Sequence, residues 1–361
     1  MSSNDQGPNF LGKNPEGDIP TSSRSNRDPD LQMAVGAEGA VLAQQEFASA
    51  EADGERVAPT RAAPKMSFGK WVTHMGWRHA VAIIAVVFAL FPIMYIINVA
   101  LNPVGSLAAA CPPDKTGFEA LMCVFPSTFS LDNFTAILND PLRPFGVWFR
   151  NTVSIAIFVA FVSTLMSAAG AFAFSRLRFQ GRRPGLLALV LLQMFPQILA
   201  ITAIFILMTN MSQVFPAIGL ATVPGLTLIY LGGSLGVNTY LIKGFFDTVP
   251  VEIDESAKID GASHVRIFFG LILRLALPVL VVVFFVTFTF IFNELAIAKV
   301  LLADIRNTTL AVGLNTYVTG NTQEWGKFAA GALISAVPMI IVFGLTQKYL
   351  VTGLTSGAVK G

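Results

Sequence analysis

Residues 254–278 read DESAKIDGASHVRIFFGLILRLALP, a charged stretch with a glycine hinge that leads directly into an apolar run. Acidic residues at positions 252, 254 and 255 favour a helix N-terminus because they complement the helix dipole. Gly261 offers the positive φ at which helices commonly end, and Ser263 can cap a second helix over 264–270. The stretch therefore predicts a short helix, a sharp turn and a second helix that continues into a longer apolar segment.

The start of the first helix carries two further expectations. Pro250 suits the first helical turn, with Thr248 as a candidate cap just before it. Asp254 and Lys258 stand four residues apart, in the acid-first order that favours an ion pair along one helix face. A rigid helix pair of this kind can transmit force into the segment that follows it, which a flexible loop would not do.

The composition of the whole chain is that of a membrane protein. Its 361 residues are 53% hydrophobic and 13% charged, they include 30 Phe, and the mean hydropathy is +0.63. Soluble domains carry about 25% charged residues, so too little charge is present to cover a globular surface of this size. The net charge of +2 gives no electrostatic support for nucleic-acid binding.

Six apolar windows approach or reach the roughly 20 residues that span a bilayer core. The windows are 80–100, 153–174, 186–208, 223–242, 275–291 and 328–349. They predict an all-α integral membrane protein with six transmembrane helices, in which the opening stretch connects the fourth span to the fifth.

Basic residues set the orientation, because short cytosolic loops are rich in Lys and Arg. The first loop, 101–149, has only Lys115 and Arg143, and the third loop, 209–222, has no basic residue. The N-terminal flank and the second and fourth loops are rich in basic residues, namely Lys65, Lys70, Arg78, Arg176, Arg178, Arg182, Arg183, Lys243, Lys258, Arg266 and Arg274. The fifth loop is mixed, with Lys299, Arg306 and Lys327 beside Asp304 and Glu324. This bias places both termini and the helix pair after residue 250 in the cytosol.

The first 64 residues differ from the remainder of the chain. They contain ten Asp or Glu against five Lys or Arg, and no aliphatic run long enough to bury a core. Such a composition is typical of a disordered tail, and it lacks the basic, apolar start of a cleavable signal peptide. We expect a cytosolic tail over 1–64 and a membrane domain over 65–361.

The two cysteines, Cys111 and Cys123, lie in the first loop. Their spacing does not suit a metal site, and no histidine lies nearby. The orientation places this loop outside the cytosol, where disulfides persist. We predict that the two cysteines pair; two unpaired thiols are the alternative.

The opening stretch also resembles a motif, the E-A-A-x-x-x-G loop of ABC importer permeases, which often contains D-G-A. The matching residues are Glu255, Ser256, Ala257, Asp260, Gly261 and Ala262. Two positions depart from the pattern: Ser256 replaces an alanine, and Arg274 stands where the family commonly has a proline. Pro278, a second expected proline, is present. Arg274 puts in doubt the bend at the base of the fifth span.

Other stretches, in chain order, are similar to the sugar-importer branch of this family. They are LDNF at 131–134, LQMFPQ at 192–197, IKGFFDTVP at 242–250 and QKYLVTGLTSGAVKG at 347–361. The ending is especially close to the smaller permease subunit of maltose/maltodextrin importers. The resemblance covers residues 70–361 and leaves the acidic tail outside it.

The resemblance implies a non-enzymatic subunit of the cell inner membrane that forms half of a maltose or maltodextrin pore. It also implies several partners: a second, larger permease subunit, a dimer of ATPase subunits, an extracytoplasmic sugar-binding protein, the sugar and membrane lipid. ATP and Mg²⁺ belong to the ATPase subunits, and this chain has no G-x-x-x-x-G-K-[ST] loop for phosphates. We expect no catalytic residue, metal or cofactor in this chain.

In the family, the E-A-A loop docks into a cleft of the ATPase subunit. We expect Glu255 to make the polar contact, Gly261 to form the turn and Ala257 to permit close approach. The small, polar C-terminal tail resembles a segment that reaches between the two ATPase subunits; its candidate residues are Gly353, Ser356, Gly357 and Lys360.

Polar residues inside the spans usually face a pore or a partner helix. The candidates for lining a pore are Gln193, Gln197, Asn238, Thr287 and Asn293, and Glu294 is expected near the outer mouth. Hydrogen bonding between helices explains the same residues equally well, so none is assigned to the sugar.

Two kinds of alternative stay open. The importer could carry another sugar, such as trehalose, an α-glucoside or glycerol phosphate. From another class, an ion-coupled secondary transporter would place ionisable residues at mid-membrane, and the centres of the six windows contain none.

Overall fold

The computed structural model describes residues 69, 75–106, 114–117, 119, 123, 129–319 and 323–358. Within these residues all regular structure is helical, and no strand occurs. The chain divides into two units, Met1–Trp77 and Arg78–Gly361, and the architecture below is that of the second.

Three helices are long and apolar enough to cross a membrane unbroken. They are α3 (Trp77–Leu101), α7 (Phe145–Arg176) and α18 (Trp325–Ala358). They contain the first, second and sixth expected windows, although α7 begins eight residues before its window.

Three further stretches are pairs of helices that are bent at a short break. The pairs are α8 (Arg182–Met194) with α9 (Gln197–Val214), α10 (Val223–Gly233) with α11 (Leu235–Phe246), and 264–275 with α15 (Leu277–Phe292). The second pair bends by 45° and the third by 79°. By length and composition the structure therefore offers three spans, or up to six when each bent pair is counted as one.

The breaks have local causes. Pro196 separates α8 from α9, and Pro278 lies in the first turn of α15. A proline has no backbone N–H to donate to the preceding turn, so it interrupts a helix and is tolerated in the first turn of the next one. The break between α10 and α11 follows Gly232 and Gly233, which weaken a helix interior.

The remaining elements are shorter helices. They are α6 (Asp132–Leu138), η2 (Pro216–Ile218), α12 (Val251–Ile259), α13 (His264–Ile267), the π-helical η3 (Phe268–Ile272), α14 (Leu273–Leu275), α16 (Ala296–Leu301), η4 (Ile305–Asn307) and α17 (Leu310–Thr319). Of these, α13, η3 and α14 together form the segment 264–275, and the others connect the spans.

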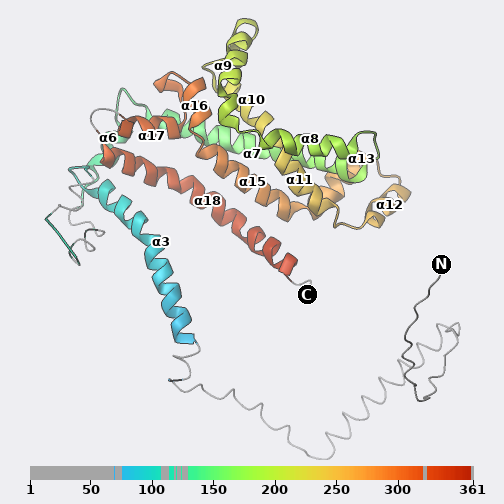
Figure 1. Ribbon diagram of the computed structural model, residues 1–361, viewed down its shortest axis with the longest axis horizontal. Helices are drawn as coiled ribbons and strands as arrows, with labels where there is room; N and C mark the ends of the chain where they lie inside the picture. The colour runs from blue at the N-terminus through green and yellow to red at the C-terminus, as the bar shows by residue number, and fades with distance from the viewer. Residues whose placement is uncertain are drawn as a thin grey trace, which may run out of the picture. The chain divides into compact units, whose positions relative to one another are not determined.

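Helix α7 lies at the centre of the packing, beside α11 and α15, and α15 in turn packs against α18 (Figure 1). Two apolar clusters fill the interior. The first surrounds Trp148, Phe288 and Tyr317, and the second, here called the inner cluster, surrounds Phe172 and Phe268. Apolar side chains elsewhere on the long helices are exposed, as on α3, where Phe88 is 81% exposed. Such faces suit a bilayer, whose acyl chains are apolar.

Candidate functional site

The predicted helix pair around Gly261 is present, although the α-helical part of the second helix ends at Ile267 and the π-helical η3 continues it past residue 270. Helix α12 ends in a turn at Gly261, where φ is +77°. The backbone N–H of Gly261 donates to the carbonyl of Lys258, and that of Ala262 donates to the carbonyl of Ala257, both at 2.9 Å. These two bonds form a Schellman motif, in which the residue at the Gly261 position needs a left-handed backbone.

The second helix begins as expected. The Ser263 hydroxyl accepts a hydrogen bond from the backbone N–H of Arg266 at 3.3 Å. Helix α13 then passes through η3 and α14 into α15. The exposed Arg274 lies in α14, four residues before Pro278.

Two expectations for the start of α12 are wrong. The Thr248 hydroxyl does not cap the helix; it donates instead to the carbonyl of Phe245 at 2.7 Å, and Pro250 occupies the N-cap position. Asp254 is buried and pairs with Arg176 at the end of α7, with 2.6 Å between Nε and Oδ2, rather than with Lys258. Asp254 lies on the buried side of α12, whereas Lys258 is exposed, which explains the change of partner.

Helix α12 has two different faces. Ile253 and Ala257 are half-buried and pack against the inner cluster, as does Ala262 beyond the turn. The opposite face is open to solvent and carries Glu255 and Ile259, the latter 87% exposed. Of the residues expected to meet an ATPase subunit, Glu255, Ser256, Asp260 and Gly261 are exposed.

The chain's C-terminal end continues α18. The backbone of Gly353, Ser356 and Gly357 belongs to this helix, which runs to Ala358. Lys360 lies outside the described residues, as does Cys111. The pairing of Cys111 with Cys123 therefore stays a prediction.

A cavity of about 500 Å³ lies between α8, the bent pair α10–α11 and α15. It brings together three of the five expected pore residues, Gln193, Asn238 and Thr287. The Asn238 amide nitrogen donates to the Thr287 hydroxyl at 3.1 Å, which joins α11 to α15.

Gln193 spans the break between α10 and α11. Its amide nitrogen donates to the carbonyl of Gly233 at 2.7 Å, and its amide oxygen accepts from the backbone N–H of Val237 at 2.5 Å. A helix break frees backbone groups that a bilayer cannot satisfy. Gln193 therefore stabilises the bend, and its side chain is committed to the backbone.

Of the other two expected pore residues, only Asn293 can be placed. The Asn293 amide donates to the carbonyl of Thr289 one turn before it, and Asn293 does not line the cavity. The side chain of Gln197 lies outside the described part of the structure.

Residues that the sequence did not single out also contribute to this region. Tyr230 and Ser234 line the cavity, and the Tyr230 hydroxyl donates to Glu294 Oε2 at 2.5 Å. Glu294 also accepts the backbone N–H groups of Ile297 and Ala298, at 2.8 and 3.0 Å. It thus caps the start of α16. A Tyr and a Ser four residues apart in an apolar run give little signal that they line a cavity.

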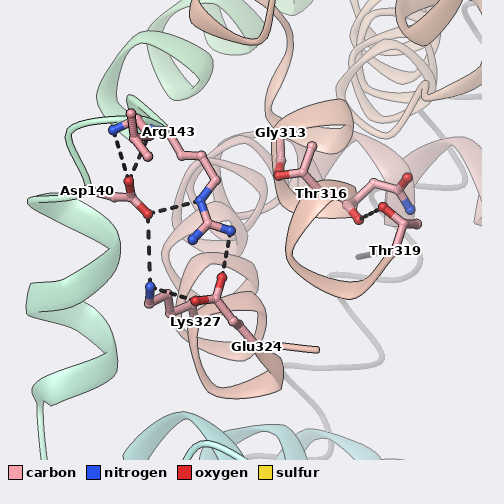
Figure 2. A network of polar contacts seen from close by, with 9 residues as sticks. Asp140, Arg143, Gly313, Thr316, Thr319, Glu324 and Lys327 are labelled. Atoms are coloured by element: carbon pink, nitrogen blue, oxygen red, sulfur yellow. Dashed lines mark hydrogen bonds and ion pairs between the residues drawn. The ribbon is translucent and has the colours of Figure 1, made fainter. Parts of the chain in front are cut away.

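Four charged residues join the segment before α7 to the start of α18, and we call them the α7–α18 clasp (Figure 2). Arg143 contacts Glu324 at 2.6 Å and Asp140 at 3.0 Å, while Lys327 contacts Glu324 at 2.9 Å. The Arg143 guanidinium also lies 4.0 Å from the centroid of the Tyr317 ring. The clasp was not expected, because its members come from two segments about 180 residues apart.

The clasp shifts the protonation of its members. Burial would raise the pKa of Asp140, but the Leu142 backbone N–H and the Arg143 charge outweigh burial and lower it. The pKa of Glu324 is lowered too, because hydrogen bonds from Arg143 and Lys327 outweigh burial. Burial raises the pKa of Tyr317 to about 12, so its hydroxyl is neutral at physiological pH.

Comparison with known proteins gives a consistent set of relatives. Residues 152–354 match the family model described as "Binding-protein-dependent transport system inner membrane component". The chain is 35% identical over 297 residues to the maltose/maltodextrin transport system permease protein MalG of Vibrio vulnificus (strain YJ016), covering 82% of this chain and 97% of that protein. It is 33% identical over 283 residues to MalG of Escherichia coli (strain K12), covering 78% and 95%.

A solved structure shares the fold. It is the crystal structure of a bacterial ABC transporter involved in the import of the acidic polysaccharide alginate. The TM-score is 0.62 at 22% identity, over 80% of this chain and 99% of that chain.

Proposed function

Because this chain belongs to the family of binding-protein-dependent transport system inner membrane components, we propose that it is a permease subunit of an ATP-driven importer of maltose or maltodextrins. It is an inner membrane protein. The observation that carries the choice of substrate is the 35% identity to a maltose/maltodextrin permease over 82% of the chain.

The proposal includes a topology of six spans with both termini in the cytosol. Three unbroken helices and three bent pairs supply the segments. The basic residues near Arg176, Arg182 and Lys243 favour the cytosolic side for the connections α7–α8 and α11–α12. Helix α12 then faces the cytosol, where ATP is available.

The exposed face of α12 is the proposed contact with an ATPase subunit. Glu255 offers a carboxylate and Ile259 an apolar side chain on one open surface. ATP and Mg²⁺ would bind to the ATPase dimer, whose closure would move α12. A larger permease subunit and an extracytoplasmic sugar-binding protein would complete the assembly. ATP binding drives transport only if it favours one arrangement of the permease over the other.

The cavity beside the α10–α11 break is proposed as part of the sugar path. Amides and aromatic rings suit sugar hydroxyls and ring faces, and the lining residues Asn238 and Phe290 offer one of each. Gln193 is excluded from sugar binding in this arrangement because both ends of its amide bond the backbone.

Transport by the complete complex in proteoliposomes tests the proposal. ATP enclosed in the vesicles should drive uptake of labelled maltose and maltotriose supplied with the binding protein. Trehalose, an α-glucoside and glycerol phosphate serve as competitors. Stronger competition by one of these than by maltose would reassign the substrate. Uptake that follows an ion gradient and ignores ATP would overturn the importer class.

A further inference from the structure

The ion pair between Arg176 and Asp254 is buried where α12 meets α7. The side chains are 8% and 5% exposed, and Nε lies 2.6 Å from Oδ2. Arg and Asp are almost never buried this deeply unless they are paired. Removing two charges from water is costly, so a buried pair is weak evidence of net stabilisation, whereas the loss of one partner alone is strongly destabilising.

Arg176 holds the segment in two places. Besides its contact with Asp254 in the first turn of α12, its Nη2 donates to the carbonyl of Val249 at 2.8 Å. Val249 lies just before Pro250, the N-cap of α12. The rigid guanidinium thus makes an ion-pair contact with the first turn of α12 and a hydrogen bond to the residue before its N-cap, so a single side chain sets both the position and the direction in which α12 begins.

Neighbouring bonds strengthen the same junction. The Ser175 hydroxyl donates to Asp247 Oδ1 at 2.7 Å, and Arg182 Nη2 donates to the carbonyl of Ser175 at 3.0 Å. The Phe172 ring on α7 lies 5.3 Å from the Phe268 ring of η3. The end of α7 is therefore joined to the chain on both sides of α12.

Helix α7 extends from this junction to the other end of the protein. Its 32 residues correspond to about 48 Å of continuous helix. At its far end, Trp148 Nε1 donates to the carbonyl of Ile305 at 2.5 Å, and the Thr152 hydroxyl accepts from the backbone N–H of Leu310 at 2.7 Å. One unbroken rod thus connects α12 to the segment 305–310.

The route along the chain is less direct. From α12 to α15 it passes the Gly261 turn, the π-helical η3 and a bend of 79°. Each of these three interrupts the regular α-helix, so the join between α12 and α15 is less direct than the rigid helix pair expected from the sequence. The contact through Arg176 bypasses all three.

We infer that Arg176 and Asp254 are positioning residues that pin α12 to α7, so that movement of α12 by an ATPase subunit is delivered along α7 to the opposite end of the permease. This inference rests on the proposed function. Neither residue touches the sugar or the nucleotide; both act through the placement of α12.

The test measures how much sugar the reconstituted complex transports for each ATP that it hydrolyses. Arg176→Met removes the pin but leaves Asp254 buried without its partner, which can impair folding. The double variant Arg176→Met/Asp254→Leu replaces both side chains by apolar ones and so leaves no buried charge unpaired. Arg178→Gln, an exposed arginine two residues away, is the matched control.

We expect the double variant to assemble with the ATPase subunits and to lower the transport per ATP about tenfold, within the range of typical coupling between sites. A merely structural defect reduces the number of intact complexes, which lowers transport and hydrolysis together and leaves their ratio unchanged. The control should keep the wild-type ratio.

Two results overturn the inference, and they differ in what else they overturn. If the wild-type complex transports sugar and the double variant keeps the wild-type ratio, the pin alone is wrong. If the wild-type complex shows no ATP-driven uptake, the proposed function is wrong and the inference fails with it.

Discussion

The turn at Gly261 permits a sharp prediction because its strain has a single source. A Cβ atom added at Gly261 would meet no atom within 4 Å, whereas the φ of +77° is one that side-chain-bearing residues rarely adopt. The energetic effect of a substitution therefore comes from the backbone and not from packing. Gly261 differs in this respect from a buried glycine such as Gly313, where an added Cβ would collide with neighbouring atoms.

The magnitudes follow from the left-handed backbone. Gly261→Ala should weaken the turn by about 1 kcal/mol, and Gly261→Val, whose branched side chain tolerates this region worse, by roughly 2 kcal/mol. Gly261→Asn should cost less than either, because Asn visits the left-handed region readily. A cost of 1 to 2 kcal/mol lowers the equilibrium population of the Gly261 turn about 5- to 30-fold.

Uptake of maltodextrin by proteoliposomes, normalised to the amount of ATPase subunit incorporated, is the assay. Activity should fall in the order Gly, Asn, Ala, Val. Gly270→Ala is the control, because Gly270 has equally open surroundings but no positive φ. Equal losses for the Asn and Val variants would refute the reasoning, since the outcome would then depend on a surface contact rather than on φ.

Three further predictions concern the other end of the permease. Gly313→Ala places a Cβ 2.2 Å from the buried Trp148 ring and should lower the free energy of unfolding by about 1–3 kcal/mol, read as a lower unfolding temperature in detergent. In the wild type, the two carboxylate oxygens of Glu294 accept from the Tyr230 hydroxyl and two backbone N–H groups. Glu294→Gln leaves only one acceptor oxygen and should lower the free energy of unfolding by about 1–2 kcal/mol, read in the same way. The carboxyl pKa values of Asp140 and Glu324 are lowered, so the clasp stabilises the protein fully above the ordinary carboxyl pKa of about 4 and loses this effect as pH falls through the lowered values. The unfolding temperature of the wild type should therefore drop more steeply between pH 5 and pH 3 than that of Glu324→Gln; parallel curves would contradict this.

Local signals in the sequence predicted the helix pair well. The Gly261 turn and the Ser263 cap depend on hydrogen bonds between residues three to five apart, and such bonds leave a pattern in the chain. The partner of Asp254 left none. Arg176 lies 78 positions away, and from the sequence the nearer Lys258 is an equally reasonable partner for Asp254.

The span count shows a second limit. Hydropathy identified each apolar window, but it could not indicate which windows are bent. Pro196 and Pro278 mark two breaks in retrospect, yet Pro92 lies inside the unbroken α3 and Pro338 inside α18. A proline in a span therefore does not by itself predict a break.

Gln193, a polar residue within a span, bonds backbone groups that one of these breaks leaves free. In lipid, the carbonyl of Gly233 and the N–H of Val237 need partners, and Gln193 supplies both from α8. A helix that satisfies its neighbour's backbone in this way cannot slide past it without exposing those groups to hydrocarbon. The bent pair and α8 should therefore move as one body during transport, and the relative motion that opens a sugar path must lie at other contacts. The single Asn238–Thr287 hydrogen bond between α11 and α15 joins side chains only, so it can break and re-form without leaving backbone groups unsatisfied.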